Sequence, residues 1–303
     1  MNKDELKLLQ NYPLDIKIEK STLRIREWYE NFNGDVYVSF SGGKDSTVLL
    51  HLVRSIYPDV EGVFMNTGIE FPQLLEHVRK FENITELRPK KPFHKVIKEN
   101  GYPVTTKSIS HKIGIVQRNG KQCNTYKYFT DETKSSKFNC SKWEYLIDAP
   151  FKLDDKCCYY LKKYPVKEYE KQTGKHPFIG TMACESVIRE TSYLQNGGCN
   201  AFNKDRPIST PLGFWTEQDI LEYIVKFNLS IPSVYGEIKQ DEKGKYYTTG
   251  LSRTGCMYCG FGAHLEKSPN RYELLKQTNP KHYEFMLNKL GFKDVLDFMN
   301  IKY

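Results

Sequence analysis

Residues 36–46 read Val-Tyr-Val-Ser-Phe-Ser-Gly-Gly-Lys-Asp-Ser. A strand-like run ends at Phe40, and a helix-like run begins at Thr47. The two glycines allow a tight turn whose backbone N–H groups can face an anion, and the helix aims the positive end of its dipole at the same point. Lys44 adds a full charge. The segment predicts a phosphate site at a strand-to-helix turn, with a plain glycine turn as the simpler alternative.

Short apolar runs alternate with amphipathic stretches over the first 110 residues. This alternation predicts βαβ units, in a Rossmann-like α/β fold whose parallel sheet carries helices on both faces. Ligands bind at the carboxyl ends of such strands, where residues 41–46 and 66–68 fall. Strands are expected at 36–40, 62–65, 84–87 and 176–180, and helices at 48–56, 72–81, 93–100 and after Thr216.

The domain organisation follows from the same patterns. We expect an α/β domain over residues 1–235, which carries the predicted phosphate site, and a C-terminal segment over 236–303 that carries a Cys-x-x-Cys pair and terminal helices. Periodicity is weak from Thr105 to Asp155, which predicts an irregular basic insert at about 88–155 within the first domain.

Composition narrows the class of protein. Of the 303 residues, 39% are hydrophobic and 27% are charged, as in globular domains. No stretch approaches the roughly 20 apolar residues that span a bilayer, and the first residues carry mixed charges, so we expect a cytoplasmic protein without a membrane partner. Eight cysteines in such a chain indicate metal or redox use rather than disulfides.

The net charge of +8 is concentrated between residues 88 and 129, where one acid, Glu99, accompanies ten basic residues. Tyr126, Tyr128 and Phe129 lie near the end of this basic window. Cations interleaved with aromatic rings suit a nucleic acid, and a solvated basic face is the alternative. The basic residues are Arg88, Lys90, Lys91, Lys95, Lys98, Lys107, Lys112, Arg118, Lys121 and Lys127.

Four of the cysteines form two pairs. Cys157 and Cys158 are adjacent, and Cys256 and Cys259 form a Cys-x-x-Cys pair. Four thiolates suit a zinc ion or a [4Fe–4S] cluster. Zinc ligands are usually separated by about two to four residues, which adjacent cysteines do not satisfy. Neighbouring thiolates can bind different irons of a cluster, so the pattern favours iron and sulfur.

These motifs resemble those of the phosphoadenosine phosphosulfate (PAPS) reductase family, within the N-type ATP pyrophosphatase superfamily. The compact glycine loop is similar to that superfamily's pyrophosphate loop, and the cysteine pairs look like the cluster signature of the adenosine phosphosulfate (APS) reductases. Further similarities are Asn66-Thr67-Gly68 before Phe71-Pro72, Lys162 four positions after the cysteine pair with Pro165, and Pro211-Leu212 before Trp215-Thr216.

The resemblance implies an adenine nucleotide alpha hydrolase-like fold with a C-terminal cluster-binding extension. It implies ATP, or an adenylate such as APS or PAPS, together with Mg²⁺ and a [4Fe–4S] cluster. It assigns catalysis to Lys44, Asp45, Lys162 and Arg189, cluster ligation to Cys157, Cys158, Cys256 and Cys259, and nucleotide contacts to Phe40, Ser41, Gly42, Gly43, Lys44, Asp45, Ser46, Asn66, Thr67 and Gly68.

The sequence differs from those of the reductases at two points that concern the reaction. A sulfonucleotide reductase attacks its substrate with a cysteine beyond the cluster pair, and residues 260–303 contain none. Leu161 stands where an arginine often precedes the family lysine. The glycine loop, in contrast, is complete. We therefore expect ATP itself to bind, as in the ATP-dependent sulfurtransferases that this pattern resembles, including the subunit that installs phosphorothioates in DNA.

In that chemistry ATP adenylates an acceptor oxygen, pyrophosphate leaves, and sulfur displaces AMP. The acceptor expected here is a nucleic acid, bound through residues 88–129, or a nucleotide, and a further protein is a possible partner or sulfur donor. Two alternatives stay open. One is an APS or PAPS reductase that borrows its thiol from Cys184 or a partner, and the other is a non-catalytic, nucleotide-dependent nucleic-acid-binding protein.

Overall fold

The computed structural model describes residues 1–130 and 139–303, and these form two compact units. The first unit comprises residues 1–66, 70–87 and 166–254, and the second comprises residues 67–69, 88–165 and 255–303. Both units are discontinuous in sequence. Their limits therefore differ from the expected ranges 1–235 and 236–303, chiefly because residues 88–165 group with the C-terminal residues.

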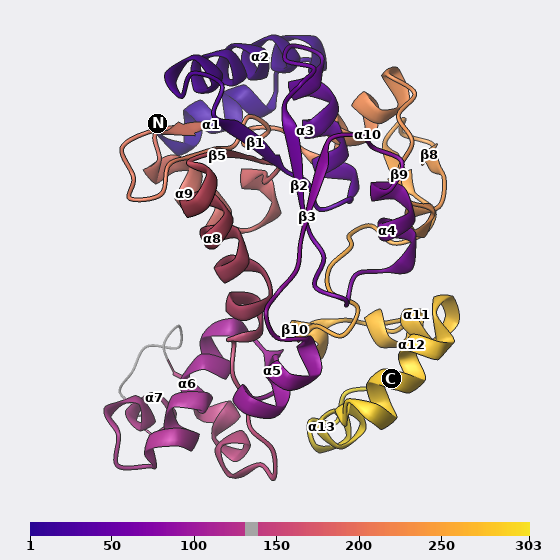
Figure 1. The fold of residues 1–303 in the computed structure, drawn as a ribbon. Coiled ribbons are helices and arrows are strands. Elements are labelled where there is room, and N and C mark those ends of the chain that lie inside the picture. The colour runs from indigo at the N-terminus through magenta and orange to yellow at the C-terminus, as the bar shows by residue number, and fades with distance from the viewer. Residues whose placement is uncertain (131–138) are drawn as a thin grey trace. The chain divides into compact units, whose positions relative to one another are not determined.

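The first unit is built on a six-stranded sheet with the order β3-β2-β1-β5-β7-β6 (Figure 1). The paired strands run parallel except for β6, which is antiparallel to β7. The mostly parallel α/β sheet expected from the sequence is confirmed. Its strands are β1 Val36–Ser39, β2 Glu61–Met65, β3 Ile84–Leu87, β5 His176–Ile179, β6 Asn200–Ala201 and β7 Ile208–Ser209, and β8 Ile238–Gln240 and β9 Tyr246–Thr248 form a separate hairpin.

Helices cover both faces of this sheet because side chains alternate along its strands. On one face, Val36 and Val38 of β1 join a core that includes Trp28 and Phe178. On the other face, Tyr37 packs with Val63 and Tyr169. The helices of this unit are α1 Lys3–Gln10, α2 Leu14–Asn31, α3 Lys44–Arg54, α4 Pro72–Val78, α8 Tyr164–Thr173, whose first residues belong to the second unit, α9 Val187–Gln195 and α10 Glu217–Lys226.

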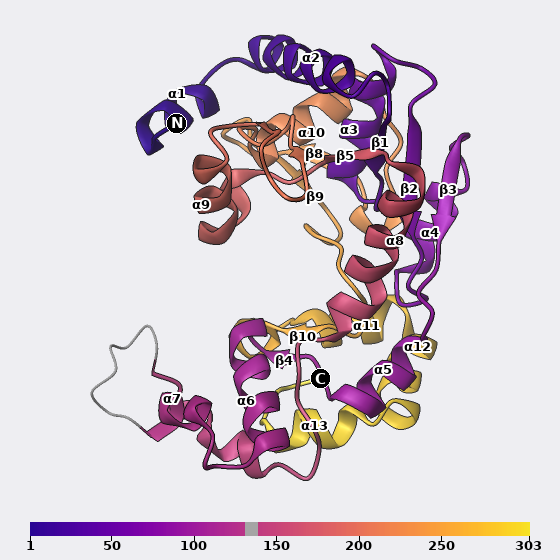
Figure 2. The ribbon, with the colours of Figure 1, turned by 60° about the vertical axis from the view of Figure 1, so that its left-hand side comes forward.

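The second unit is mainly helical and contains one short parallel pair, β4 with β10. Figure 2 shows α6 following β4, with β10 beside it. A π-helical turn, 159–163, follows the first cysteine pair, and a second one spans 285–289. The elements are α5 Phe93–Asn100, β4 Val104–Thr105, α6 Lys107–Asn119, α7 Lys127–Thr130, β10 Gly260–Phe261, α11 Arg271–Thr278, α12 Pro280–Glu284 and α13 Phe292–Phe298.

The expectation of an irregular segment from Thr105 to Asp155 was wrong, because α6 is a regular helix of 13 residues. Thr106 caps it by accepting a hydrogen bond from the backbone N–H of Ile109. The helix buries Ser110 and Gly114 beside Ile113 and Val116, and these small residues hide its apolar stripe in the sequence. Residues 131–138 of this segment lie outside the described residues.

The longest described helix, α2, is tied to α10 by a buried ion pair. Lys17 is 1% exposed, and its ammonium lies 2.6 Å from Asp219 Oδ2 and 2.7 Å from the carbonyl oxygen of Gln10. Asp219 also closes the capping box of α10 with Thr216, at the start of the helix that was expected after Thr216. Among the described helices, none has both the length and the apolar character that crossing a bilayer requires.

We predict that Lys17→Ala lowers the free energy of unfolding by about 3–5 kcal/mol, because it leaves the Asp219 carboxylate buried without its cation. Urea denaturation followed by circular dichroism measures this change. Lys7→Ala, an exposed lysine on α1, is the control and is expected to change stability by less than about 0.5 kcal/mol. Similar, small losses in both variants would contradict the structural role of the pair.

Candidate functional site

The glycine loop leaves the carboxyl end of β1 and leads directly into α3, which begins at Lys44 rather than at Thr47. Phe40 is buried beneath the loop. Gly42 has φ +74°, and a Cβ atom there would lie 2.6 Å from Val78 Cγ2. A glycine is therefore required both by the backbone conformation and by the close approach of α4.

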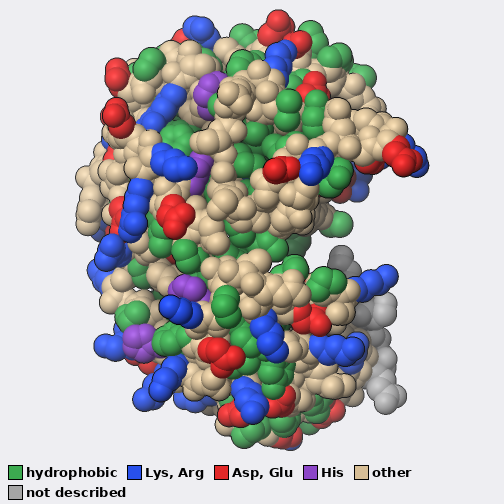
Figure 3. Space-filling view, turned by 90° about the vertical axis from the view of Figure 1, so that its right-hand side faces the viewer, with side chains coloured by type: hydrophobic (Ala, Val, Ile, Leu, Met, Phe, Trp, Pro, Cys, Tyr) green, Lys and Arg blue, Asp and Glu red, His purple; other side chains and the backbone are tan. Residues whose placement is uncertain are grey.

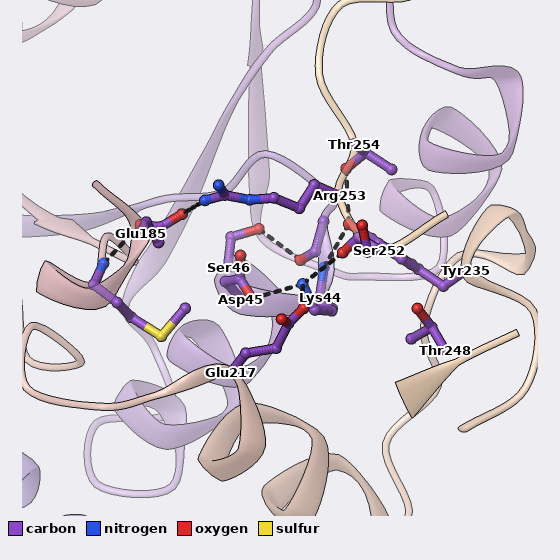
Figure 4. Close-up of polar contacts among 12 residues, drawn as sticks. Lys44, Asp45, Ser46, Glu185, Glu217, Tyr235, Thr248, Ser252, Arg253 and Thr254 are labelled. Atoms are coloured by element: carbon purple, nitrogen blue, oxygen red, sulfur yellow. Dashed lines mark hydrogen bonds and ion pairs between the residues drawn. The ribbon is translucent and has the colours of Figure 1, made fainter. Parts of the chain in front are cut away.

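Lys44 holds its ammonium in a buried, polar position at the start of α3 (Figure 4). The side chain is 3% exposed, and Nζ donates a 3.0 Å hydrogen bond to the carbonyl oxygen of Ser252. Carboxylates of Asp45 and Glu217 lie 3.4 and 3.3 Å from Nζ, and the Tyr235 hydroxyl accepts a 3.3 Å hydrogen bond from the Lys44 backbone N–H. The charge at the helix N-terminus is thus held in place before any anion binds.

The serines of the loop are held by hydrogen bonds within the loop itself. Ser46 Oγ donates to the carbonyl oxygen of Gly43 at 2.9 Å and accepts from the backbone N–H of Ser41 at 3.2 Å. Asp45 Oδ1 is buried and, within the described part of the chain, makes no hydrogen bond. The same oxygen lies 3.4 Å from the Lys44 ammonium, and a carboxylate oxygen beside a phosphate-type loop is a ligand that Mg²⁺ prefers, so Asp45 fits the expected metal.

Arg189 lies at the same end of the first unit but is already engaged. Both Arg189 and Arg253 form ion pairs with Glu185, and Figure 4 shows the Arg253 contact. Burial lowers the pKa of Arg189, and the Arg253 charge lowers it further. Cys184 is the neighbouring exposed cysteine, and partial burial raises the pKa of its thiol.

Sequence reasoning missed several residues around the loop. Glu217, Tyr235 and Ser252 contact Lys44, and Thr254 hydrogen-bonds the Tyr235 hydroxyl at 2.7 Å. They come from separate segments that carry no motif of their own. Of these residues, only Glu217 could have been located from the sequence, because it is the first residue of the helix predicted after Thr216.

The expected nucleotide segment Asn66-Thr67-Gly68 crosses the division between the units, since Asn66 belongs to the first unit and the other two residues to the second. The Asn66 amide donates a 3.1 Å hydrogen bond to Glu86. Gly68 has φ +78° and open space where a Cβ would stand. Its role toward a nucleotide stays a prediction.

The four candidate cluster ligands are brought together in the second unit. Cys157, Cys158, Cys256 and Cys259 line one pocket with Lys162, and the other lining residues are Ile69, Phe93, Pro103 and Leu161. The two adjacent sulfurs lie 4.0 Å apart. The pocket is therefore sulfur-rich, apolar and carries a cation, which suits an anionic iron–sulfur cluster.

The distances between the sulfur atoms can be compared with those of a zinc site. Four thiolates at about 2.3 Å from one zinc ion would lie about 3.8 Å from one another. In the described residues, the group of ligand atoms found within 4.8 Å of one another is His111, Asp154 and Asp155, and no three of the four cysteines form such a group. Cys157 Sγ and Cys158 Sγ lie 4.0 Å apart, close to the roughly 3.8 Å expected around one zinc ion, so this pair suits zinc as well as a cluster.

Nearby cations act unequally on the thiols of this pocket. The Cys157 thiol donates a hydrogen bond to Cys158 and lowers the pKa of Cys158, and the charges of Lys107 and Lys162 lower it further. The pKa of Cys157 is raised, because its proton is held in that hydrogen bond and because the group is buried. Burial also raises the pKa of Cys259.

Much of the charge in the basic window is compensated within the second unit. Arg118 pairs with buried Asp154, Lys91 lies 2.6 Å from Glu99, and Lys121 lies 2.7 Å from Asp148. Lys112 lies over the Tyr128 ring at 4.5 Å. On the face drawn in Figure 3, Lys and Arg side chains are interspersed with Asp and Glu side chains. The window is thus less uniformly basic in three dimensions than in sequence.

Comparisons with known proteins bear on this fold and this site. The sequence profile described as "Phosphoadenosine phosphosulfate reductase domain" matches residues 35–111. An adenosine 5'-phosphosulfate reductase of Staphylococcus haemolyticus is 24% identical over 226 residues, which cover 72% of each chain. An uncharacterized protein of Methanocaldococcus jannaschii is 25% identical over 258 residues, which cover 82% of this chain and 48% of that protein. The chain thus spans about half the length of the archaeal protein.

Among solved structures, the crystal structure of a phosphoadenylyl-sulfate reductase from Candida auris has a TM-score of 0.43 at 16% identity, covering 81% of this chain and 98% of that chain. The parallel sheet and the strand-to-helix loop place the protein in the Rossmann-like α/β class. The profile match over residues 35–111 and the reductase relatives show that this part of the chain is similar to the PAPS reductase domain.

One buried histidine of α4 contacts α3, and it predicts that the stability of the protein depends on pH. His77 Nε2 lies 3.2 Å from Thr47 Oγ1, and burial lowers the pKa of His77 from 6.5 to about 4. Between these two values the unfolded chain binds more protons at this residue than the folded protein does. Stability is therefore full above about pH 6.5 and falls as the pH is lowered toward 4.

In His77→Gln this contribution is absent, so we expect the difference in unfolding free energy between wild type and variant to shrink below pH 6.5, by at most about 1.4 kcal/mol per pH unit. Denaturant titrations at several pH values measure it. His94→Gln, an exposed histidine, is the control and should track the wild type. A difference that does not change with pH would show that the pKa of His77 is the same in the folded and unfolded states.

Proposed function

We propose that this protein is an ATP-dependent, iron–sulfur enzyme that adenylates an acceptor, with release of pyrophosphate, for sulfur transfer to a nucleic acid or nucleotide. The observation that carries the proposal is the complete glycine loop with the buried Lys44 ammonium at the N-terminus of α3. A reductase that binds a ready-made adenylate has no pyrophosphate to release, whereas an ATP-cleaving enzyme needs a preorganised cation at that position.

The loop supports this chemistry in three ways. Gly42 allows the tight turn of the loop beside α4, the helix dipole and backbone N–H groups favour negative charge, and Lys44 would neutralise the charge that grows on a departing pyrophosphate. The Lys44 backbone N–H donates a long hydrogen bond of 3.3 Å to the Tyr235 hydroxyl, so a phosphate oxygen can replace that hydroxyl at low cost.

Asp45 would hold Mg²⁺ through its carboxylate, whose Oδ1 lies 3.4 Å from the Lys44 ammonium, and the metal would share the phosphate charge. The ion pairs of Lys44 with Asp45 and Glu217 are expected to loosen when phosphate arrives, because the ammonium then gains a stronger anionic partner. Arg189 would need to leave Glu185 before contacting a nucleotide, so we propose a supporting role for it.

The cysteine pocket would hold the cluster through Cys157, Cys158, Cys256 and Cys259. Four thiolates leave no open iron, so we propose a structural and electrostatic role for this site rather than direct catalysis. Lys162 lies in the pocket wall and contributes positive charge there.

A second candidate, sulfonucleotide reduction, is favoured by one observation: relatives that cover about 70% of this chain, at 24% identity, are named adenosine 5'-phosphosulfate reductases. That reaction requires a thiol that attacks sulfur. Cys184 is exposed and lies in the first unit with the glycine loop, but burial raises its pKa, which makes it a poor nucleophile at neutral pH.

We predict that Lys44→Ala lowers pyrophosphate release from ATP by about 10²- to 10³-fold, since one preorganised charge at the leaving group is removed. Anaerobic incubation with labelled ATP and a panel of single-stranded oligonucleotides and nucleotides as acceptors measures the release. Lys80→Ala, an exposed lysine, is the control. ATP that stays intact with every acceptor, together with sulfite release from APS and thioredoxin, would support the reductase instead.

The metal assignment has its own test. Anaerobically purified protein is expected to contain about four iron and four acid-labile sulfide per chain, and Cys158→Ser or Cys259→Ser to lose most of both. Cys123→Ser is the matched control, because Cys123 lies outside the pocket. Stoichiometric zinc in place of iron would overturn the cluster while leaving the ATP proposal standing.

A further inference from the structure

Arg253 belongs to a short segment that is held against the glycine loop. The residue before it, Ser252, accepts a 3.0 Å hydrogen bond from Lys44 Nζ through its carbonyl oxygen. The residue after it, Thr254, approaches the loop so closely that its Oγ1 would lie 3.3 Å from a Cβ atom at Gly43. The backbone on both sides of Arg253 is therefore fixed by the loop, and its side chain starts from a defined position.

From this position the Arg253 side chain reaches Glu185, as Figure 4 shows. Arg253 pairs with Oε1 of that carboxylate, and Arg189 pairs with Oε2. Oε2 also accepts a 2.8 Å hydrogen bond from the backbone N–H of Met182. Two guanidinium groups thus converge on one carboxylate whose side chain is 9% exposed, and the three charged groups together carry one net positive charge.

The carboxylate does not use the full binding capacity of the two arginines. Each guanidinium has five N–H donors, and within residues 1–130 and 139–303 neither makes a hydrogen bond or ion pair with any side chain other than Glu185. Their side chains are 42% and 55% exposed, so their remaining donors can reach a ligand. Arg189 also lies in the first turn of α9, where the helix dipole disfavours a cation. Paired arginine forks of this kind match the oxygen atoms of a phosphate.

We propose that Arg189 and Arg253 form a second oxyanion site beside the glycine loop, which binds a phosphate group, and that Glu185 competes with this phosphate for the two guanidinium groups. The inference rests on the proposed function, because that reaction places a further phosphate next to the pyrophosphate of ATP. This phosphate is either the α-phosphate of ATP or a phosphate of the acceptor. Both present the same tetrahedral oxyanion to the arginines.

The test is the dissociation constant of the full-length protein, measured by isothermal titration calorimetry for three probes: α,β-methylene-ATP, which cannot release pyrophosphate, inorganic pyrophosphate, and single-stranded oligothymidylate. Arg253→Met is expected to weaken the probe whose phosphate occupies the site by about 10- to 100-fold, since charge-assisted hydrogen bonds are lost. Glu185→Gln is expected to tighten the same probe, because the competing charge is removed while an amide oxygen still accepts from Met182.

The probes distinguish the two sources of the phosphate. Weaker binding of α,β-methylene-ATP by Arg253→Met, with pyrophosphate unchanged, supports the site and assigns it to the α-phosphate. Weaker binding of the oligothymidylate alone supports the site and assigns it to the acceptor. Arg24→Met is the matched control, because Arg24 also pairs with a single carboxylate, that of Glu27, and is 47% exposed. It should match the wild type with every probe.

Circular dichroism of each variant accompanies the titrations, and Arg253→Lys, which keeps the charge without the planar fork, should lose less affinity than Arg253→Met. Unchanged affinities in Arg253→Met would overturn the proposal. Equal weakening in Arg253→Met and Glu185→Gln would also overturn it, because the ion pairs would then serve only the fold. Since no probe needs to react, a protein that never releases pyrophosphate from ATP would overturn the proposed function and leave this result readable.

Discussion

The buried ammonium of Lys44 is the constraint around which the first unit is organised. An ammonium removed from water costs several kcal/mol unless oxygen atoms surround it, so the chain must supply partners from outside the loop. It does so from Ser252 and Glu217, and Tyr235 closes the same site from its own segment. Residues 217–254 are therefore ordered around a loop that lies some 170 to 210 residues earlier in the sequence.

The second unit is also organised around one site, which is the cysteine pocket rather than a phosphate loop. Its cysteine pairs lie about one hundred residues apart and line one pocket together with Lys162. Within the basic window, Arg118 and Lys121 are paired with Asp154 and Asp148. A run of like charges in sequence thus includes residues that are paired with acids in the folded chain.

The sequence predicted the features that depend on neighbouring residues and missed those that depend on contacts between distant segments. The strands and the glycine loop were recognisable because alternation and turn chemistry are local, and β1, β2, β3 and β5 lie where they were expected. Helix α6 was missed because Ser110 and Gly114 occupy part of its buried face, so the apolar period is interrupted. Arg189 was recognised as a candidate, but its pairing with Glu185 depends on packing that no motif encodes.

The sequence by itself determined the α/β class, the position of the glycine loop, the four candidate cysteine ligands and the resemblance to the PAPS reductases, since each depends on residue types at short spacing. Only the tertiary structure decided what surrounds them: the oxygen atoms that hold Lys44, the ion pair of Lys44 with Asp45, and the pocket that brings the two cysteine pairs together. The physical reason is that burial and charge pairing are properties of contacts between distant segments, and these arise when the chain closes around its core.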